Sequence, residues 1–374
     1  MNKKIGLVMT GGGARAAYQV GVVRALYEIL GKKDQFAQVI TGNSAGAINA
    51  TYLAASNESW DKTTNNLIKI WENLKPNNIF DLRTKTISQL GMKWLSGTLL
   101  GGMTSSGSTV NYLLDTHPLK NLLQKEIDFD QLNKNITDKK IYGVGLSTTN
   151  YNSGSSVIFY QGSNQIQDWA RSDRFSCRED LNLNHLMAST AIPFFFPPVK
   201  VRESYFGDGC IRQTTPLSPA IHLGADKIIG IGIRYPHQQN RMMDMAFSPI
   251  SNPPIGQIAG VMLNAIFLDS LEADVERLHH INALMQEKSP DKFKAIPILM
   301  IRPSRDLGKM TEKLNNDLPL SLRYLLKGIG VSDTKGLDLL SYLAFDGSYT
   351  KPLIELGYED TFKMEKDILE FNDV

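Results

Sequence analysis

The sequence predicts an α/β protein built on a mostly parallel sheet. Short apolar runs alternate with amphipathic helical runs up to about residue 75, which is the pattern of a parallel βαβ sheet. Two of these predicted strands end in glycine-containing turns that lead directly into helices. Further apolar strands follow at 139–147, 156–160, 227–233 and 296–301, a helix is predicted at 182–189, and the chain from residue 318 onward has a helical period.

The first strand, Ile5–Met9, is followed by three consecutive glycines and a helix. Glycines ahead of a helix expose backbone amides, so this loop can hold a phosphate or the oxyanion of an acyl-transfer intermediate. The loop also fits the dinucleotide fingerprint, with Gly11, Gly13 and Ala16 at its three positions. That interpretation requires an acidic residue at the end of the second strand, and none stands there. The sequence therefore disfavours a nicotinamide or flavin enzyme.

The second strand, 37–41, runs into a G-x-S-x-G pentapeptide centred on Ser44, and a helix is predicted over 47–55. This context is typical of a nucleophile elbow, a tight turn that presents one hydroxyl at the edge of a sheet. Glycine is common enough that the pentapeptide alone is a weak signal. Its early position disfavours an ordinary α/β-hydrolase, in which the nucleophile follows more strands and a histidine comes last. The six histidines lie in turns, structural helices or solvated faces.

An aspartate is the better candidate partner for this serine. Asp208 stands between Gly207 and Gly209 at the end of a short apolar run, and the two glycines allow a turn that exposes its carboxylate. A run with three prolines and three phenylalanines precedes it. We expect this run to form the wall of an apolar pocket, although it could be core. The expected wall residues are Ile192, Pro193, Phe194, Phe195, Phe196 and Pro197.

Residues 76–110 differ from their surroundings, because they begin with a proline-containing loop and become rich in glycine and serine. Here the sequence predicts a mobile insertion near the mouth of the site. Its glycine-rich part, 96–110, is equally well explained as a lid and as an ordinary disordered loop.

The apolar helix predicted at 255–271 continues into a charged run to residue 284 and is too polar to span a membrane. A core helix or a lipid-facing helix is the better interpretation.

Composition excludes several classes of function. The 374 residues carry a net charge of +2, which is too mild to indicate nucleic-acid binding. Cys177 and Cys210 provide neither a disulfide framework nor a metal motif, and there is no calcium-binding loop pattern. We therefore expect no cofactor and no metal, and a reducing, cytoplasmic location. The apolar stretch at the N-terminus is too short for a signal peptide.

Four ordered segments of the chain resemble the signature blocks of patatin-like phospholipases. They are Gly11-Gly12-Gly13-Ala14-Arg15, Gly42-Asn43-Ser44-Ala45-Gly46, residues 188–198, and Asp208-Gly209. The segments at 215–233, 267–277 and 353–357 are similar to those of the bacterial members, so the resemblance covers most of the chain. Four blocks in order are far more specific than any one of them.

This resemblance implies a three-layer α/β/α fold with additional C-terminal helices. It implies a catalytic domain over 1–233, and an extension over 234–374 with one further strand and mostly helices, packed on the same domain. It also implies a lipid acyl hydrolase that cleaves fatty-acyl esters of phospholipids or lysophospholipids and makes peripheral contact with a membrane. Nothing in the sequence indicates the oligomeric state.

The resemblance also assigns roles to residues. Ser44 would be the nucleophile and Asp208 its partner. The amides of the glycine loop, 11–15, would form the oxyanion hole, with Arg15 adding positive charge. The chain departs from the family at Cys210, where Gly or Ala is usual, and at Ala16, where Gly is usual.

Several alternatives stay open at this point. A transacylase or a hydrolase of small soluble esters would use the same pair of residues. A catalytically idle lipid- or partner-binding protein would keep the fold without the reaction.

An aspartate is a weak base, but an apolar pocket disfavours its charged form and raises its basicity. The hydrolase hypothesis therefore requires Asp208 to be buried next to Ser44.

Overall fold

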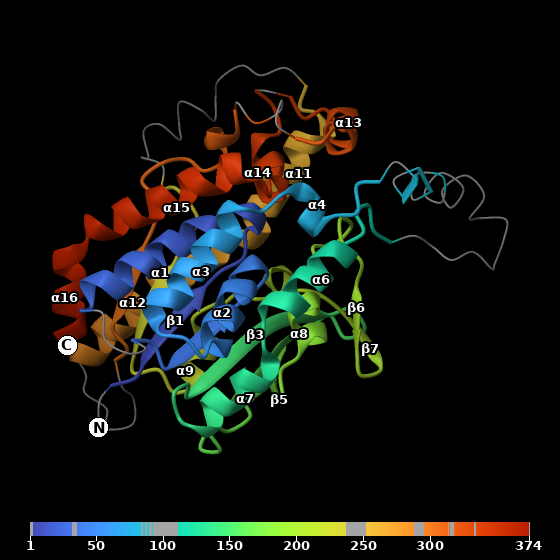
Figure 1. Ribbon diagram of the computed structural model, residues 1–374. Helices are drawn as coiled ribbons and strands as arrows, with labels where there is room; N and C mark the ends of the chain where they lie inside the picture. The colour runs from blue at the N-terminus through green and yellow to red at the C-terminus, as the bar shows by residue number, and fades with distance from the viewer. Residues whose placement is uncertain are drawn as a thin grey trace.

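The computed structural model describes residues 3–31, 36–83, 85–86, 88–89, 92, 111–236, 252–287, 295–312, 314, 318–332 and 334–373 (Figure 1). Within these residues the strands form one nine-stranded sheet, with the order β5-β4-β3-β2-β1-β8-β9 along its main path. The parallel strands are β1 (Ile5–Met9), β2 (Val39–Gly42), β3 (Gly143–Asn150), β8 (Lys227–Ile231) and β9 (Ile298–Ile301). The prediction of a mostly parallel sheet is confirmed.

Four strands complete the sheet on one side. β4 (Ser156–Gly162) runs antiparallel to β3, and β5 (Arg174–Arg178) runs parallel to β4 at the edge. The hairpin of β6 (Val199–Val201) and β7 (Ser204–Asp208) pairs with the last residues of β3. Asp208 is thereby placed opposite Thr148, close to the edge where the parallel strands end.

Helices cover both faces of the sheet because neighbouring side chains of a strand point to opposite sides. Leu7 and Met9 of β1 belong to one apolar core, whereas Val8 belongs to another. The helices on the first side are α1 (Ala17–Ile29), α2 (Ala45–Ala55), α3 (Trp60–Glu72), α14 (Leu337–Leu343) and α15 (Gly347–Phe362). The second side is covered by α9 (Ser218–His222) and α12 (Asp269–Glu287). The result is the expected three-layer arrangement (Figure 1).

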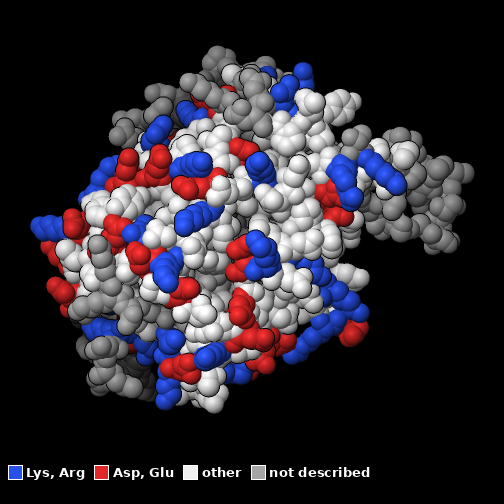
Figure 2. Space-filling model, in the orientation of Figure 1, with Lys and Arg blue, Asp and Glu red and all other residues white. Residues whose placement is uncertain are grey.

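The remaining helices surround these layers. They are η1 (Gly13–Ala16), α4 (Pro76–Ile79), α6 (His117–Glu126), α7 (Phe129–Thr137), α8 (Leu183–Ser189), η2 (Gly209–Ile211), α11 (Ile255–Phe267), η3 (Lys309–Thr311), α13 (Leu320–Gly328) and α16 (Glu365–Asp373). Basic and acidic side chains are interspersed over most of the visible face, in keeping with the small net charge (Figure 2). In the described part of the chain, no helix combines the length and the apolar character needed to cross a membrane.

The C-terminal part of the chain is built into the same body. β9 extends the sheet beside β8, and α15 lies along α1 (Figure 1). The two helices touch backbone to backbone: a Cβ at Gly21 would lie 1.9 Å from the carbonyl oxygen of Ile354, and one at Gly357 would lie 2.1 Å from that of Tyr18. A domain boundary at 233–234 stays a prediction.

Several predicted elements have different ends in the structure. The strand expected at 139–147 begins only at Gly143, because Lys139 has a positive φ of 59° and turns the chain. The long helix expected at 255–284 is two helices, α11 and α12, and the second begins with acidic residues in its first turn, which favour a helix N-terminus. β5 was not predicted, because its charged sequence lacks an apolar alternation. Most of the predicted insertion at 76–110, including the lid candidate 96–110, lies outside the described residues.

Candidate active site

The glycine loop crosses the edge of the sheet between β1 and η1, where close packing leaves no room for side chains. A Cβ at Gly11 would lie 2.5 Å from both Ser44 Cβ and Cys210 Sγ. Gly13 has a positive φ of 57°, and a Cβ there would lie 2.1 Å from the carbonyl oxygen of Tyr342 in α14. The loop is thus held between Ser44 on one side and a C-terminal helix on the other.

The amides of this loop are available to a ligand. The first N–H groups of a helix have no acceptor within it, and η1 begins at Gly13. In the described part of the chain, the amides of Gly12, Gly13 and Ala14 donate no hydrogen bond, whereas the amide of Arg15 donates to the carbonyl of Gly12 at 3.2 Å. The amide of Gly11 faces the Cys210 thiol. Three neighbouring donors can therefore stabilise an anion.

Ser44 occupies a strained turn between β2 and α2. Its φ of 53° and ψ of −132° are rare for a residue with a side chain. The turn closes only because glycines flank it: a Cβ at Gly46 would lie 2.2 Å from the carbonyl oxygen of Met9, and one at Gly42 would lie 2.5 Å from that of Gly46. Asn43 and Ala45 complete the pentapeptide in buried positions. Such strain is characteristic of functional turns.

Asp208 lies at the end of β7 and is fully buried, so the expectation that its turn exposes the carboxylate is wrong. Neither Gly207 nor Gly209 has a positive φ, because the chain continues from β7 directly into η2. Its Oδ1 accepts a hydrogen bond from the amide of Cys210 at 2.9 Å. Its Oδ2 is buried and accepts no well-aligned hydrogen bond from the described residues. Burial raises the pKa of Asp208 from 3.8 to about 6, and the nearby Ser44 hydroxyl and Cys210 amide oppose that rise. A carboxylate with this pKa is a better proton acceptor than an exposed aspartate.

One short segment holds the backbones of both residues in place. The amide of Ser44 donates to the carbonyl and the hydroxyl oxygens of Ser189 at 3.1 and 3.2 Å. The amide of Asp208 donates to the carbonyl of Ala191 at 2.9 Å. The Ser189 hydroxyl donates in turn to the carbonyl of Ser147 at 2.7 Å. The segment 189–191 therefore sets the spacing between the elbow and the aspartate turn. The Ser44 and Asp208 side chains meet although the two residues are 164 positions apart in the sequence.

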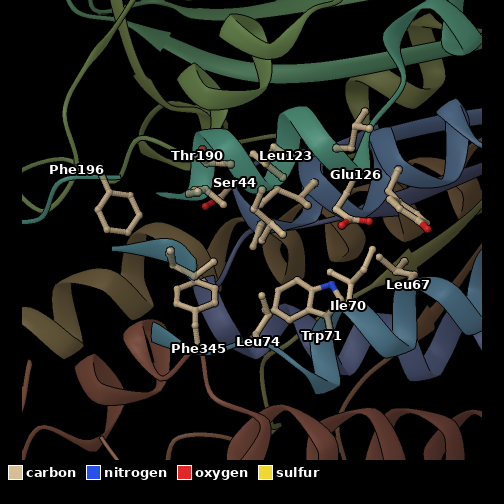
Figure 3. A pocket seen from close by; sticks show the side chains of 18 of the residues that line it. Ser44, Leu67, Ile70, Trp71, Leu74, Leu123, Glu126, Thr190, Phe196 and Phe345 are labelled. Carbon is tan, nitrogen blue, oxygen red and sulfur yellow. The ribbon is translucent and has the colours of Figure 1, made fainter. Parts of the chain in front are cut away.

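A long apolar cavity starts at Ser44 (Figure 3). It has about 640 Å³ of empty space, its open mouth included. Its walls come from α2, α3, α6 and the loops around them. They comprise Gly13, Ser44, Ala45, Ile48, Tyr52, Leu67, Ile70, Trp71, Leu74, Ile79, Leu119, Leu122, Leu123, Glu126, Ile127, Thr190, Ile192, Phe196 and Phe345. In Figure 3 Ser44 lies between Phe196 on one side and Leu123 and Glu126 on the other, so apolar side chains flank the serine in both directions along the cavity.

Only part of the predicted pocket wall lines this cavity. Ile192 and Phe196 do, whereas Pro193, Phe195 and Pro197 do not. Phe194 is 70 % exposed and has a positive φ of 67°. The proline-rich run turns sharply at this point, so its three aromatic rings face different directions. The wall is therefore contributed by fewer residues of this run than the sequence predicts.

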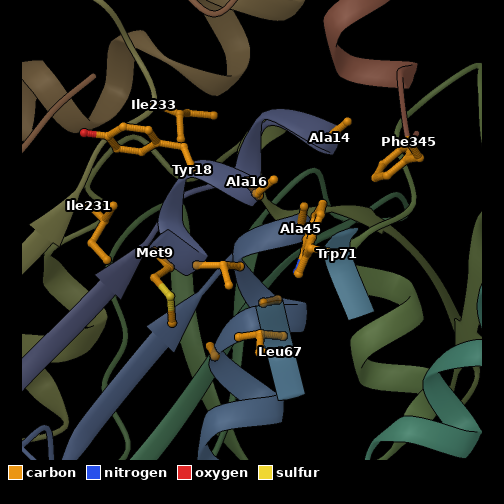
Figure 4. Packing of buried hydrophobic residues seen from close by; sticks show 14 of the residues in the cluster. Met9, Ala14, Ala16, Tyr18, Ala45, Leu67, Trp71, Ile231, Ile233 and Phe345 are labelled. Atoms are coloured by element: carbon orange, nitrogen blue, oxygen red, sulfur yellow. The ribbon is translucent and has the colours of Figure 1, made fainter. Parts of the chain in front are cut away.

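Sequence reasoning missed most of the cavity. Its larger wall comes from α3 and α6, where Leu67 and Trp71 follow a helical spacing of four, as do Leu119 and Leu123. That spacing predicts a buried helix face, but it does not distinguish a core from a cavity wall. Figure 4 shows Trp71 beside Ala45, the residue that follows the nucleophile candidate.

The Arg15 side chain has partners in the C-terminal helices. Its guanidinium forms an ion pair with Asp338 at 2.8 Å, donates to the Ser341 hydroxyl at 2.7 Å and lies 4.4 Å from the ring centre of Tyr342. It lines a second, polar cavity and not the cavity at Ser44. A positive contribution of Arg15 to the oxyanion site thus stays a prediction.

Among the described residues, no cluster of histidine, cysteine and acidic side chains could hold a metal ion.

A family model described as patatin-like phospholipase matches residues 7–221. No curated protein matches the sequence.

Solved structures similar to this chain share little sequence with it. Human GIVD cytosolic phospholipase A2 is 11 % identical, with a TM-score of 0.47, and the match covers 99 % of this chain and 60 % of that one. VipD from Legionella pneumophila is 13 % identical, with a TM-score of 0.35 and coverage of 98 % and 67 %. The type III effector ExoU of Pseudomonas aeruginosa is 16 % identical, with a TM-score of 0.30 and coverage of 65 % and 45 %. The chain thus spans about half to two thirds of the length of these proteins.

Proposed function

Since this chain belongs to the patatin-like phospholipase family, we propose that it hydrolyses fatty-acyl esters of phospholipids or lysophospholipids through a Ser44–Asp208 dyad. Family membership supports a lipid hydrolase. One observation supports the dyad above all others: the buried Oδ2 of Asp208, without a well-aligned partner among the described residues, beside the Ser44 hydroxyl. A buried polar atom without a hydrogen-bond partner costs folding free energy and is rare in native proteins, and a catalytic role is one explanation for it.

The first half of the proposed reaction forms an acyl-enzyme. Ser44 Oγ attacks the ester carbonyl carbon while its proton passes to Asp208. The carbonyl oxygen becomes an oxyanion, which the amides of Gly12, Gly13 and Ala14 would stabilise, since they donate to no other described group. The bond between the carbonyl carbon and the alcohol oxygen then breaks, and Asp208 returns the proton to the leaving alcohol.

The second half releases the fatty acid. A water molecule attacks the acyl carbon and gives a proton to Asp208, and a second oxyanion forms in the same loop. The bond to Ser44 Oγ breaks, and the proton returns to the serine. Net consumption is one ester and one water, and the products are an acid and an alcohol.

The apolar cavity supports a fatty-acyl substrate over a small soluble ester. Most of its lining is aliphatic or aromatic, and it extends from Ser44 between α3 and α6 (Figure 3). Burying an acyl chain there gains about 0.8 kcal/mol for each methylene group. The chain would also exclude water from Asp208 and so help to maintain the raised pKa.

Fluorophosphonate labelling, read together with fatty-acid release from mixed phospholipids, tests the proposal. The wild type should label once and release fatty acid. Ser44→Ala should do neither. Asp208→Asn should label at least about 100-fold more slowly, because general-base catalysis is lost. A Ser44→Ala variant that releases fatty acid as fast as the wild type would refute the dyad, and a wild type that is folded but does not label would favour an idle lipid-binding protein.

A further inference from the structure

Helix α11 is apolar on two opposite sides. One side packs inward, with Gly256, Gly260, Leu263 and Phe267 buried. The other side is exposed: Ile255, Ile258, Val261 and Met262 are 70, 49, 60 and 57 % exposed. Their spacing of three, four and seven residues places them on one face of the helix. No charged residue occurs in α11.

Helix α13 repeats this arrangement. Leu322 and Leu326 are buried, whereas Leu320 and Tyr324 are 78 and 82 % exposed. The charged residues of α13 are both basic, Arg323 and Lys327. At helical spacing they lie on the same side as Leu320 and Tyr324. The outward face of α13 therefore combines large apolar side chains with positive charge.

The two helices adjoin, and their exposed apolar side chains (Ile255, Ile258, Val261, Met262, Leu320 and Tyr324) are together called the α11–α13 face. The amide of Gly256, at the start of α11, donates to the carbonyl of Ile329, directly after α13, at 2.8 Å. Figure 1 shows α13 beside α11 at one end of the molecule. In Figure 2 this region is largely white with basic side chains at its upper edge. Large exposed apolar side chains gathered on two adjoining helices mark an interaction site.

We propose that the α11–α13 face docks the protein on the surface of an anionic lipid bilayer. Apolar side chains with interspersed arginine and lysine are the composition of helices that lie in a membrane interface. The charge argues for this occupant, since both charged residues of the two helices are basic and match acidic headgroups, each contributing about tenfold or less to binding. This inference goes beyond the proposed hydrolysis and holds whether or not Ser44 is the nucleophile.

Docking there would place the bilayer close to the site. The inner side of α11 reaches the glycine loop, where a Cβ at Gly11 would lie 3.0 Å from Cδ1 of Phe267. A single helix therefore separates the α11–α13 face from the amides that the proposed function uses.

Vesicle sedimentation tests the proposal, with vesicles of phosphatidylcholine alone and of phosphatidylcholine with phosphatidylserine. Val261→Ser with Met262→Ser, and separately Leu320→Ser with Tyr324→Ser, should weaken binding to vesicles that contain phosphatidylserine by about tenfold or more. Arg323→Gln with Lys327→Gln should reduce the preference for phosphatidylserine and leave binding to phosphatidylcholine unchanged. Hydrolysis of a soluble ester should be unchanged in all of them, which separates docking from catalysis.

The matched control is Ile281→Ser with Leu284→Ser. These residues of α12 are 45 and 61 % exposed, but their helix also carries acidic side chains. This control should bind vesicles like the wild type. The proposal is overturned if the wild type binds neither kind of vesicle, if the control loses as much binding as the apolar variants, or if those variants bind like the wild type. It is also overturned if light scattering shows a wild-type dimer that the substitutions dissociate while vesicle binding persists.

Discussion

The burial of Asp208 should lower the stability of the protein at neutral and alkaline pH. Its pKa in the folded state, about 6, lies above the ordinary 3.8, so the folded chain holds a proton more tightly than the unfolded chain. This contribution to stability is fully present below pH 3.8 and is lost as the pH rises through about 6. The difference corresponds to an upper estimate of about 3 kcal/mol at pH 8.

Asp208→Asn should therefore be inactive and yet more stable than the wild type at pH 8, by up to about 3 kcal/mol. At pH 4 the gain should shrink toward zero. Urea unfolding at both pH values measures this, with Asp138→Asn as a control, since Asp138 is exposed and its substitution should have little effect. A variant less stable than the wild type at pH 8 would contradict the argument.

Cys210 is one of the two positions at which the sequence departs from the expected family pattern, and it lies against the site. Its side chain approaches Asp208 and helps to lower the pKa of that carboxyl against the larger effect of burial. In the wild type, kcat/KM should rise with pH through about 6, because Asp208 must be deprotonated to accept a proton.

Cys210→Ala removes that interaction, so the rise should move to higher pH. A pH profile with a soluble ester measures the shift, and Cys177→Ala, at a partly buried cysteine on β5, should leave the profile unchanged. A Cys210→Ala profile at the wild-type position would show that the thiol does not act on the carboxyl.

At the residue scale, the sequence could identify what local chain geometry determines. Ser44, Asp208 and the glycine loop each lie beside glycines at which a Cβ would lie 2.5 Å or less from another atom, namely Gly11, Gly13, Gly42, Gly46 and Gly209. The contacts between Cys210 and Gly11, and between Arg15 and Asp338, could not be predicted, because they join segments separated by most of the chain. Phe194 could not be excluded from the wall, because its exposure depends on a positive φ that the sequence does not indicate for phenylalanine.

At the scale of elements, α1 and α15 pack closely because glycines lie at their contact. Gly21→Ala would drive a methyl group to 1.9 Å from the carbonyl oxygen of Ile354. The two helices must then separate, which should cost about 1–3 kcal/mol or more. Urea unfolding measures the loss.

Gly328→Ala is the control for this substitution. Gly328 is also helical, and a Cβ there would meet nothing within 4 Å. This variant should be as stable as the wild type or more stable by up to about 1 kcal/mol. Equal stability of Gly21→Ala and the wild type would show that the helices are free to separate.

The ends of helices and strands could be predicted where neighbouring residues determine them, and not where distant segments do. α8 and β9 lie close to their predicted positions, because a side-chain cap at Asn182 and an apolar run define them. The short strands β5 to β7 could not be predicted, because pairing with distant strands decides them. The break between α11 and α12 also differs from the single helix that the sequence predicts. The helices α3 and α6 could be recognised as buried, but not as the walls of one cavity, since the space between them is set by how they pack.

At the scale of the whole molecule, the C-terminal helices brace the glycine loop. Arg15 is only 3 % exposed, and its ion pair with Asp338 joins η1 to α14. Tyr342 of α14 supports Gly13 from the same side. Removing one member of this contact leaves the other without its charge partner, at a cost of about 1–2 kcal/mol, because Asp338 is 41 % exposed and water screens the pair.

If the loop amides stabilise an oxyanion, loosening this brace should affect the transition state more than substrate binding. Asp338→Asn and Arg15→Met should each lower kcat by about tenfold and leave KM nearly unchanged. The double variant should be little worse than either single variant, since both act through one contact. Arg83→Gln, which removes an ion pair between an exposed arginine and Asp81, should leave both constants unchanged. Losses that add fully in the double variant would show that Arg15 and Asp338 act independently, and the bracing of the loop by the C-terminal helices would then have to be abandoned.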